Sequence, residues 1–392
     1  MQRVEWSARL DALVVFRGLL DAPLVQALRA ALAAGEPELG GALAAFEAAL
    51  FRRGTNWTRA LLDLLLEDEN LCLQVAAGGD AGPVLEKALT EELDLLQALG
   101  RAQLDELFHG APDYLPRWQT DPEADYHAAY QARRAAVGRT GYGIFARYHV
   151  FTLKDGRLAP VRYPDPQRLS ELPGYERERE KVIANTRALL EGRPANNVLL
   201  YGDAGTGKSS TVKAIANEFA PDGLRLIEVK KNQLYQIPAL MDELAKNPLK
   251  FLLFIDDLSF TANDDNFAAL KAILEGSVGG RSRNVAVYAT SNRRHLVKET
   301  MSDRTAGDDI HAGDTRQELM SLSARFGLTV TFQRPDKALY ETIVMDLAAR
   351  CGVQMPSDQL MMRAEAFALR AGGRSPRVAK QFVELAAAGV GV

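Results

Sequence analysis

The sequence predicts an α/β protein in which a parallel sheet carries a phosphate-binding loop, with helical segments before and after it. From Leu172 onward, short apolar runs alternate with helical ones, the pattern of parallel strands joined by crossover helices. Residues 202–209 read Gly-Asp-Ala-Gly-Thr-Gly-Lys-Ser directly after one such run, and they match the pattern G-x-x-x-x-G-K-S/T. Before Arg134 and after Pro335 the apolar residues recur at helical spacing instead.

The composition limits the class of protein. A chain of 392 residues can hold two or three domains, and its net charge of −4 argues against a passive nucleic-acid coat. Cys72 and Cys351 lie far apart without metal-binding spacing, which indicates a reducing compartment and no zinc site. The first residues are charged, and no apolar run approaches the length of a membrane span. We therefore expect a cytoplasmic protein with no membrane partner.

Residues 1–134 are expected to form a helical accessory domain. They are rich in Ala and Leu at helical spacing. Segments that contain Gly or Pro bound helices of ordinary length, at 35–37, 78–83 and 110–112. No chemistry can be assigned to this domain from its residues, and we expect it to bind an unidentified protein partner.

The remaining chain divides into a linker, a core and a lid. Residues 135–171 are expected to be a linker that contains a β-hairpin turning at Asp155-Gly156. Residues 172–334 are expected to form the core, and its strands are mostly apolar, as strands buried on both faces should be. These strands are expected at 198–201, 224–229, 251–255, 284–289 and 328–332. Residues 335–392 are helical in pattern and are expected to form a small lid.

The phosphate loop is the most specific motif in the chain. Its glycines allow consecutive backbone N–H groups to turn toward a polyphosphate, and the following helix adds its positive end. Lys208 would reach the β and γ phosphates of ATP, and Ser209 would ligate Mg²⁺. The alternative is a glycine-rich turn with no ligand. The expected phosphate-binding residues are Gly202, Asp203, Ala204, Gly205, Thr206, Gly207, Lys208, Ser209 and Ser210.

Polar residues follow two of the expected strands. Asp256 and Asp257 end the strand 251–255, at the carboxyl end where ligands bind in open α/β sheets. Asp256 suits Mg²⁺ held through a bound water, and Asp257 can polarise an attacking water. Asn292 follows the strand 284–289 and can hold that water in line with the γ phosphate. A helix cap or solvated turn for the carboxylates, and an Asx turn for Asn292, are the structural alternatives.

Two arginines lie where they can contact a phosphate chain. Arg325 precedes the last strand, and arginine suits the charge that spreads over a transferring phosphoryl group, including when a neighbouring subunit supplies it. Arg377 falls in the first turn of a helix capped by Ser375, where the helix dipole disfavours a cation. Taken alone, each residue is equally well explained as a surface arginine.

Together these residues resemble the AAA+ ATPases, from Leu172 to the end of the chain. Residues 202–209 are similar to Walker A and residues 251–257 to Walker B, while Gly174 lies in a segment similar to the one that packs against adenine. The resemblance implies that Asn292 is sensor 1, Arg325 the arginine finger and Arg377 sensor 2. It also implies a five-stranded parallel sheet in the order 5-1-4-3-2. More closely, residues 256–260, 288–296 and 322–327 resemble an uncharacterised bacterial family of ATP-binding proteins with a helical N-terminal region.

The resemblance implies Mg²⁺-dependent ATP hydrolysis that drives remodelling or loading of a macromolecular partner. It further implies a homo-oligomer in which Arg325 acts on the neighbouring subunit's nucleotide. Many AAA+ members have glutamate where this chain has Asp257, so the base is one methylene shorter. The alternative is therefore a nucleotide-gated binding module with little turnover. A small-molecule kinase is disfavoured because no acceptor-site motif is present.

A basic cluster surrounds the sensor strand. Its side chains can face a neighbouring nucleotide or a nucleic acid, but a solvated basic face is the usual explanation, so nucleic acid is possible and not favoured. The cluster consists of Arg281, Arg283, Arg293, Arg294, His295 and Lys298.

Overall fold

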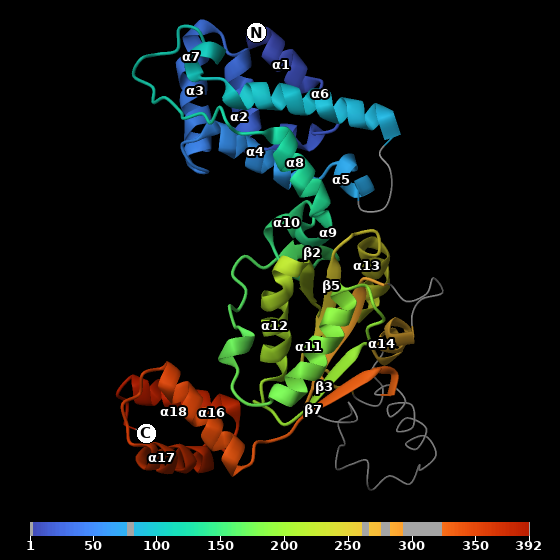
Figure 1. The fold of residues 1–392 in the computed structure, drawn as a ribbon, viewed down its shortest axis with the longest axis vertical. Coiled ribbons are helices and arrows are strands. Elements are labelled where there is room, and N and C mark those ends of the chain that lie inside the picture. The colour runs from blue at the N-terminus through green and yellow to red at the C-terminus, as the bar shows by residue number, and fades with distance from the viewer. Residues whose placement is uncertain (1–2, 77–81, 261–265, 276–282, 293–323, 392) are drawn as a thin grey trace. The chain divides into compact units, whose positions relative to one another are not determined.

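The computed structural model describes residues 3–76, 82–260, 266–275, 283–292 and 324–391 (Figure 1). The chain divides into two compact units, Met1–Arg147 and Tyr148–Val392, each with its own hydrophobic core. Within the described residues, no helix is both long enough and apolar enough to cross a membrane.

The first unit consists of helices around a core that is mainly leucine and that includes a group of packed aromatic rings. Phe46 meets Trp57 and Trp118 edge to face, with ring centroids 5.3 Å apart in both pairs. The boundary expected at residue 134 falls inside a helix, and the unit continues to Arg147. Its elements are α1 (Arg3–Asp11), the 3₁₀ helix η1 (Arg17–Asp21), α2 (Pro23–Ala33), α3 (Glu36–Phe51), α4 (Trp57–Glu67), α5 (Leu71–Ala76), α6 (Gly82–Arg101), α7 (Leu104–Leu107), α8 (Tyr126–Ala135), α9 (Val137–Thr140) and α10 (Ile144–Arg147).

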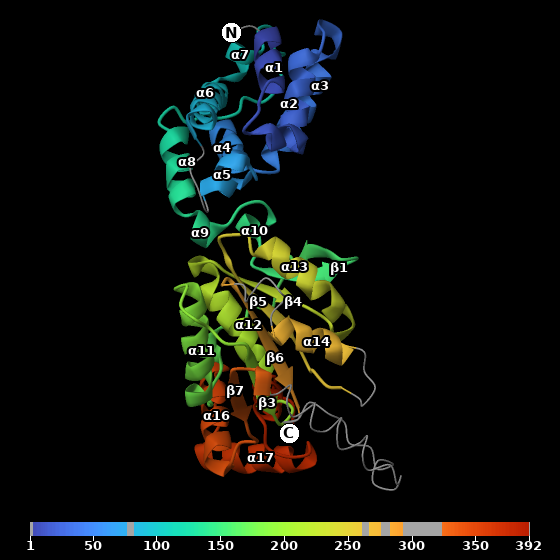
Figure 2. The ribbon, with the colours of Figure 1, turned by 90° about the vertical axis from the view of Figure 1, so that its right-hand side faces the viewer.

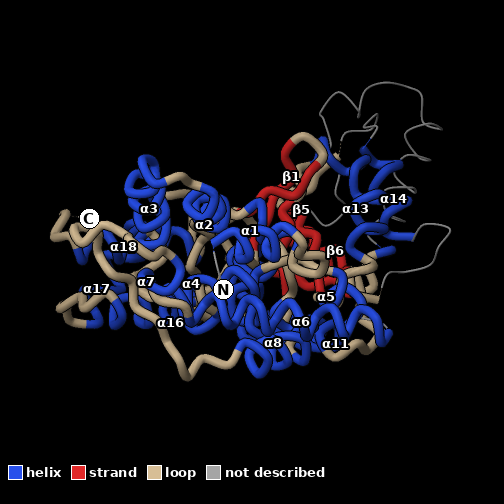
Figure 3. Tube along the Cα trace, turned by 90° about the horizontal axis from the view of Figure 1, so that it is seen from above, coloured by secondary structure: helices blue, strands red, loops and turns tan. Residues whose placement is uncertain are grey.

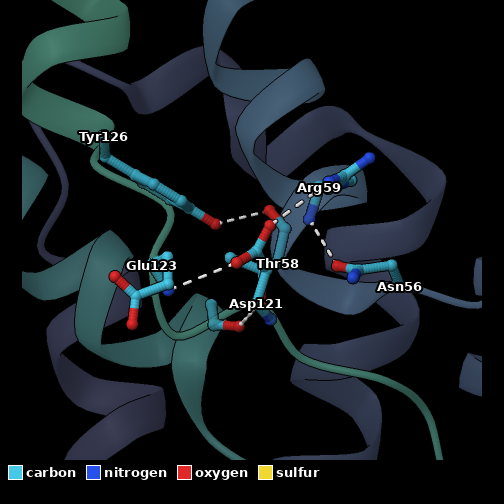
Figure 4. A network of polar contacts seen from close by, with 7 residues as sticks. Asn56, Thr58, Arg59, Asp121, Glu123 and Tyr126 are labelled. Carbon is cyan, nitrogen blue, oxygen red and sulfur yellow. Dashed lines mark hydrogen bonds and ion pairs between the residues drawn. The ribbon is translucent and has the colours of Figure 1, made fainter.

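A polar network ties the start of α4 to segments far away in the sequence (Figure 4). The buried Thr58 hydroxyl donates to the carbonyl oxygen of Gly100 at 2.7 Å and accepts from the backbone N–H of Asp121 at 2.8 Å. The Tyr126 hydroxyl donates to the carbonyl oxygen of Thr58 at 2.7 Å. Asn56 caps α4 by accepting from the backbone N–H of Arg59 at 2.9 Å. These bonds join α4, the end of α6 and the segment before α8.

The second unit is built on one sheet of seven strands, in the order β2-β1-β4-β5-β6-β3-β7. The prediction of a five-stranded, wholly parallel sheet is therefore wrong. The expected hairpin turns at Asp155 and Gly156, both at positive φ, but it is part of the sheet: β1 pairs in parallel with β4 and antiparallel with β2. The other strands pair in parallel throughout, reading β7-β3-β6-β5-β4 from the opposite edge. The strands are β1 (Val150–Lys154), β2 (Arg157–Pro160), β3 (Val198–Gly202), β4 (Leu224–Glu228), β5 (Lys250–Ile255), β6 (Val285–Ser291) and β7 (Leu328–Phe332).

Helices cover both faces of this sheet. Figures 2 and 3 show α13 and α14 along one side, and Figure 2 shows α11 and α12 on the other. Alternate residues of each strand point to opposite faces, so Leu200, Phe254 and Tyr288 pack in one cluster with Val182 of α11 and Ile215 of α12. The helices are η2 (Leu169–Glu171), α11 (Glu176–Leu190), α12 (Lys208–Phe219), η3 (Ala220–Asp222), η4 (Lys231–Gln236), α13 (Ile237–Leu244), α14 (Asn266–Glu275), α16 (Lys337–Arg350), α17 (Ser357–Arg370) and α18 (Pro376–Ala387).

The last three helices form the expected helical segment after the sheet. Asp336 caps α16 by accepting from the backbone N–H of Leu339 at 2.8 Å. Ser375 caps α18 by accepting from the backbone N–H of Val378 at 3.2 Å, and Pro376 occupies the first helical position, as the sequence predicts. Tyr340 of α16 and Phe382 of α18 are fully buried in the cluster shared with the sheet.

Asp68 should make the stability of the first unit depend on pH. Burial raises the pKa of Asp68 to about 6, and the negative charges of Glu69 and Glu92 act in the same direction, against a hydrogen bond from Asn70. The folded state therefore favours the protonated form. The contribution of protonated Asp68 to the free energy of unfolding is fully present below about pH 4 and is lost as the pH rises through about 6. We expect the free energy of unfolding to fall by ~1–2 kcal/mol, a value kept small because water partly reaches the side chain.

The measurement is denaturant unfolding between pH 4 and pH 7, followed by tryptophan fluorescence. All three tryptophans, Trp6, Trp57 and Trp118, lie in the first unit, so the signal reports on that unit alone. Asp68→Asn should flatten the pH dependence, whereas Asp63→Asn, at an exposed position of α4, should leave it unchanged. If the free energy of unfolding of Asp68→Asn depends on pH as it does in the wild type, Asp68 is not the source of that dependence.

Candidate nucleotide-binding site

Three glycines shape the turn between β3 and α12. Gly202 has φ 138°, and a Cβ built on it would lie 2.0 Å from the carbonyl oxygen of Phe332 in β7. Gly205 and Gly207 have φ of 76° and 90°, in the region that glycine adopts at least cost. The glycines therefore permit a close approach to β7 and a loop that begins α12 at Lys208.

Lys208 is buried at the base of the loop. Its Nζ donates to the carbonyl oxygens of Gly202 at 2.8 Å and Asp203 at 2.7 Å, and to Oδ1 of Asn292 at 3.1 Å. Burial lowers the pKa of Lys208, while Asp203, Asp257 and Asp256 act to raise it. The ammonium is thus held between the loop and the end of β6, where it can neutralise a bound phosphate chain.

The ends of β5 and β6 meet the start of α12 at the carboxylate of Asp256. Its Oδ1 accepts from the Ser209 hydroxyl at 2.6 Å, from the Thr290 hydroxyl at 2.5 Å and from the backbone N–H of Asp257 at 3.1 Å. Asn292 donates from Nδ2 to Oδ1 of Asp257 at 2.8 Å. Because the same Asn292 amide accepts from Lys208, it bridges the loop cation and the second carboxylate.

These oxygens form a donor set that fits Mg²⁺. The ion is usually held by one or two carboxylates together with phosphate oxygens and waters, rather than by an all-protein cage. Ser209 and Asp256 supply a hydroxyl and a carboxylate already in contact. Among the described residues, no cluster of three or more His, Cys, Asp or Glu could hold a metal.

A cavity of about 720 Å³ connects the loop with the lid helices. Residues 204–210 line it, together with Asp256, Asp257 and Asn292. Leu172 and Pro173 line it as well, on the side formed by Ile343 and Leu347 of α16. The lining thus joins the polar residues of the loop to four apolar side chains from the segment before α11 and from α16, with Glu171, Arg350 and Lys380 also present.

The lid contacts the phosphate loop directly. The backbone N–H of Arg377 donates to the carbonyl oxygen of Gly205 at 3.1 Å, and Arg377 lines the cavity. Oδ2 of Asp203 accepts from the backbone N–H of Arg334 at 2.9 Å, in the segment that leads into the lid. The loop therefore contacts the lid at two places, the first turn of α18 and the segment between β7 and α16.

Four expected site residues lie outside the cavity lining, namely Gly202 and Asp203 at the start of the loop, Gly174 and Arg325. Gly174, at φ 73°, packs against the lid, because a Cβ there would lie 3.0 Å from Leu339 and 3.1 Å from Ile343. Arg325 forms an ion pair with Glu275 of α14 in its own chain. Of the basic cluster, Arg283 is exposed, whereas Arg281, Arg293, Arg294, His295 and Lys298 lie outside the described residues.

Sequence reasoning gave no role to Thr290. Its side chain is 1% exposed, and it contacts both Asp256 and Asp257. The available signal was its spacing, since residues two apart in a strand point to the same face and Thr290 lies two before Asn292. A buried hydroxyl at this position needs a partner, and the strand end of β5 provides one.

A family model described as "Protein of unknown function (DUF815)" matches residues 145–390, which is more than half of the chain. The chain belongs to this family. Among curated proteins, the replication factor C large subunit of Thermococcus kodakarensis is 35% identical over 189 residues, covering 45% of this chain and 35% of that protein. The proteasome-activating nucleotidase of Methanocella arvoryzae is 26% identical over 153 residues, covering 34% of this chain and 37% of that protein.

The chain spans about a third of the length of these relatives. Among solved structures, the RuvB Holliday junction branch migration motor of Thermotoga maritima aligns at 18% identity and a TM-score of 0.39, over 57% of this chain and 67% of that one. The family match and the curated relatives confirm the resemblance to AAA+ P-loop ATPases.

Gly202→Ala should destabilise the second unit far more than an ordinary glycine substitution. The added Cβ would overlap the Phe332 carbonyl oxygen, so we expect a loss of roughly 3 kcal/mol or more. Gly192→Ala is the matched control, because φ there is 68° but no atom lies within 4 Å of the added Cβ, so its loss should be about 1 kcal/mol. Unfolding followed by circular dichroism measures both, and equal losses would contradict the close-approach argument.

Proposed function

We propose that the second unit binds Mg²⁺ and ATP in its cavity and hydrolyses the ATP, and that the chain uses this cycle to remodel or load a macromolecular partner. The observation that carries the proposal is the convergence on one cavity of the phosphate loop, two carboxylates, a bridging amide and a lid arginine. All residues that line this cavity belong to the second unit. We further propose that the first unit binds the protein partner.

In the proposed complex, the loop and the lid divide the nucleotide between them. Backbone N–H groups of residues 204–210 and the Lys208 ammonium bind the phosphates, with Arg377 near the γ phosphate. Ser209 and Asp256 hold Mg²⁺, which would neutralise charge on the transferring phosphoryl group. The apolar side chains of Leu172, Pro173, Ile343 and Leu347 suit contact with a base, with Gly174 giving the backbone room against the lid.

Asp257 and Asn292 are the proposed water-activating residues. Asp257 is exposed at the end of β5 and can accept a proton from water in the cavity. The Asn292 amide donates to Asp257 and accepts from Lys208, so it fixes the carboxylate relative to the loop cation. An ordered carboxylate near the phosphate end of the cavity is the arrangement that general-base catalysis requires.

Arg325 is proposed to complete the site of a neighbouring subunit. Within its own chain it pairs with Glu275 and is not among the residues that line the cavity. A guanidinium supplied from a second chain would make hydrolysis depend on assembly into a homo-oligomer. We therefore propose a homo-oligomeric ATPase.

The central experiment compares ATP binding with multiple-turnover hydrolysis. Lys208→Ala should lose nucleotide binding, because a buried cation at the phosphates is removed. Asp257→Asn should keep ATP affinity within about threefold and lose at least about a hundredfold in turnover, as the base can no longer accept a proton. Retained turnover in Asp257→Asn would remove Asp257 from the catalytic role.

The shorter carboxylate favours a second candidate, a nucleotide-gated module with little turnover. The same measurements separate the two functions. A gated module would show ATP binding but negligible turnover in both the wild type and Asp257→Asn. It would still bind a partner differently in the ATP-bound state, which capture with Asp257→Asn against Lys208→Ala as the control would detect.

The role of Arg325 in trans can be tested by mixing inactive variants. Arg325→Ala should bind ATP and assemble but lose hydrolysis, by ~10³-fold for an arginine of this kind. Mixing it with Asp257→Asn should restore part of the activity, because an Asp257→Asn subunit can supply its arginine to an Arg325→Ala site. Arg283→Ala, at an exposed arginine before β6, is the control and should stay active. No recovery in a mixture shown to co-assemble would overturn the assignment in trans.

A further inference from the structure

Thr290 links the ends of two adjacent strands through one hydroxyl group. The hydroxyl donates to Oδ1 of Asp256 at 2.5 Å and accepts from the backbone N–H of Asp257 at 2.9 Å. The Thr290 carbonyl oxygen accepts from the backbone N–H of Leu258 at 2.7 Å. A single residue of β6 therefore holds three consecutive residues that follow β5.

The roles of donor and acceptor in this link are fixed by chemistry. A backbone N–H can only donate, so the Thr290 hydroxyl must accept from Asp257. An ionised carboxylate can only accept, so the single hydroxyl proton goes to Asp256. One threonine thus satisfies both bonds at once, which valine of the same shape cannot do.

The backbone of Asp257 is in a conformation that needs such support. Its φ of 48° lies in the left-handed region, which costs a residue with a side chain about 1–2 kcal/mol. Bonds from its N–H to Thr290 and Asp256 hold this turn, and the turn directs the Asp257 carboxylate to Asn292. The direction of the proposed base therefore depends on the hydroxyl of Thr290, a residue that is 1% exposed.

The same hydroxyl also fixes the proposed metal ligand. Oδ1 of Asp256 takes the bonds from Ser209, Thr290 and Asp257, which leaves Oδ2 outside this network. If Ser209 turns its oxygen toward Mg²⁺, the bonds from Thr290 and Asp257 still hold the carboxylate in place. The orientation of Asp256 would then not have to be set anew when the ion binds.

On the basis of the proposed function, we propose that Thr290 is a positioning residue. Thr290 lines the cavity, but its hydroxyl is already bonded to Asp256 and to the backbone N–H of Asp257. We infer that this hydroxyl acts by aligning Asp256 for Mg²⁺ and Asp257 for water, and not by binding the nucleotide. Removing the hydroxyl should therefore affect Mg²⁺-dependent steps and spare the Mg²⁺-free binding of nucleotide by the phosphate loop.

The test compares Thr290→Val with Thr290→Ser. Binding of a fluorescent ADP analogue is titrated with and without Mg²⁺, and hydrolysis is measured as a function of Mg²⁺ concentration. Without Mg²⁺, the affinity of Thr290→Val for the analogue should stay within about twofold of the wild-type value. The increase in affinity that Mg²⁺ produces should be about tenfold smaller than in the wild type. The kcat for hydrolysis should fall while KM changes little. Thr290→Ser keeps the hydroxyl and should restore the Mg²⁺ effect to within about threefold.

Thr186→Val is the matched control for loss of a buried threonine hydroxyl. Thr186 is fully buried in α11, where it donates to the carbonyl oxygen of Val182 at 2.9 Å and pairs with Tyr288 at 2.8 Å, and it does not line the cavity. Its variant should lower the thermal midpoint and leave the Mg²⁺ effect unchanged. A Thr290→Val protein that behaves in the same way would overturn the proposal.

Two further outcomes keep the result decisive. If Thr290→Val does not fold, Thr290→Ser carries the test, and loss of the Mg²⁺ effect in this hydroxyl-bearing variant would also overturn the proposal. If the wild type binds nucleotide with Mg²⁺ but does not hydrolyse it, the ATPase proposal fails. The binding titrations would then still show whether Thr290 aligns Asp256 for Mg²⁺.

Discussion

Parallel pairing of β3, β5 and β6 is the constraint on which the candidate site depends. β6 lies between β3 and β5, so the carboxyl ends of all three strands reach one edge of the sheet. The phosphate loop follows β3, the carboxylates follow β5, and Thr290 and Asn292 end β6 and follow it. Ser209, Thr290 and Asn292 then find the carboxylates of Asp256 and Asp257 across the strand ends. The strand register that buries the apolar faces of the sheet therefore also brings the polar side chains of the candidate site together.

Much of the sheet and the site was predictable because local signals agreed with the fold. Buried apolar runs, a glycine-rich turn and the caps at Asp336 and Ser375 act within a few residues. What could not be predicted depends on contacts that are distant in sequence. β1 joins the sheet through pairing of Val150 with Leu226, and nothing near the hairpin indicates this partner. Likewise, β6 continues to Ser291, beyond its last apolar residue, since Ser291 pairs with Tyr201 of β3.

The phosphate loop also connects the sheet to the lid. Gly205 accepts from the first turn of α18, and Asp203 accepts from the segment between β7 and α16. Tyr175 reinforces this connection, since its hydroxyl donates to the carbonyl oxygen of Gln333 at 2.6 Å and its ring packs on Phe332. Burial raises the pKa of Tyr175, so it remains a neutral donor. A ligand that moved the loop would therefore act on two attachment points of the lid at once.

Arg325 is a proposed site residue that does not line the cavity of its own chain. Its ion pair with Glu275 joins the residue before β7 to the end of α14, with side chains 27% and 46% exposed. An ion pair that water reaches to this extent contributes ~1 kcal/mol or less, because solvent screens it and both side chains lose freedom. Contact of Arg325 with the phosphates of a neighbouring subunit's nucleotide would offset the loss of its ion pair with Glu275. The pair with Glu275 can thus hold Arg325 in the single chain without preventing its proposed use in an assembly.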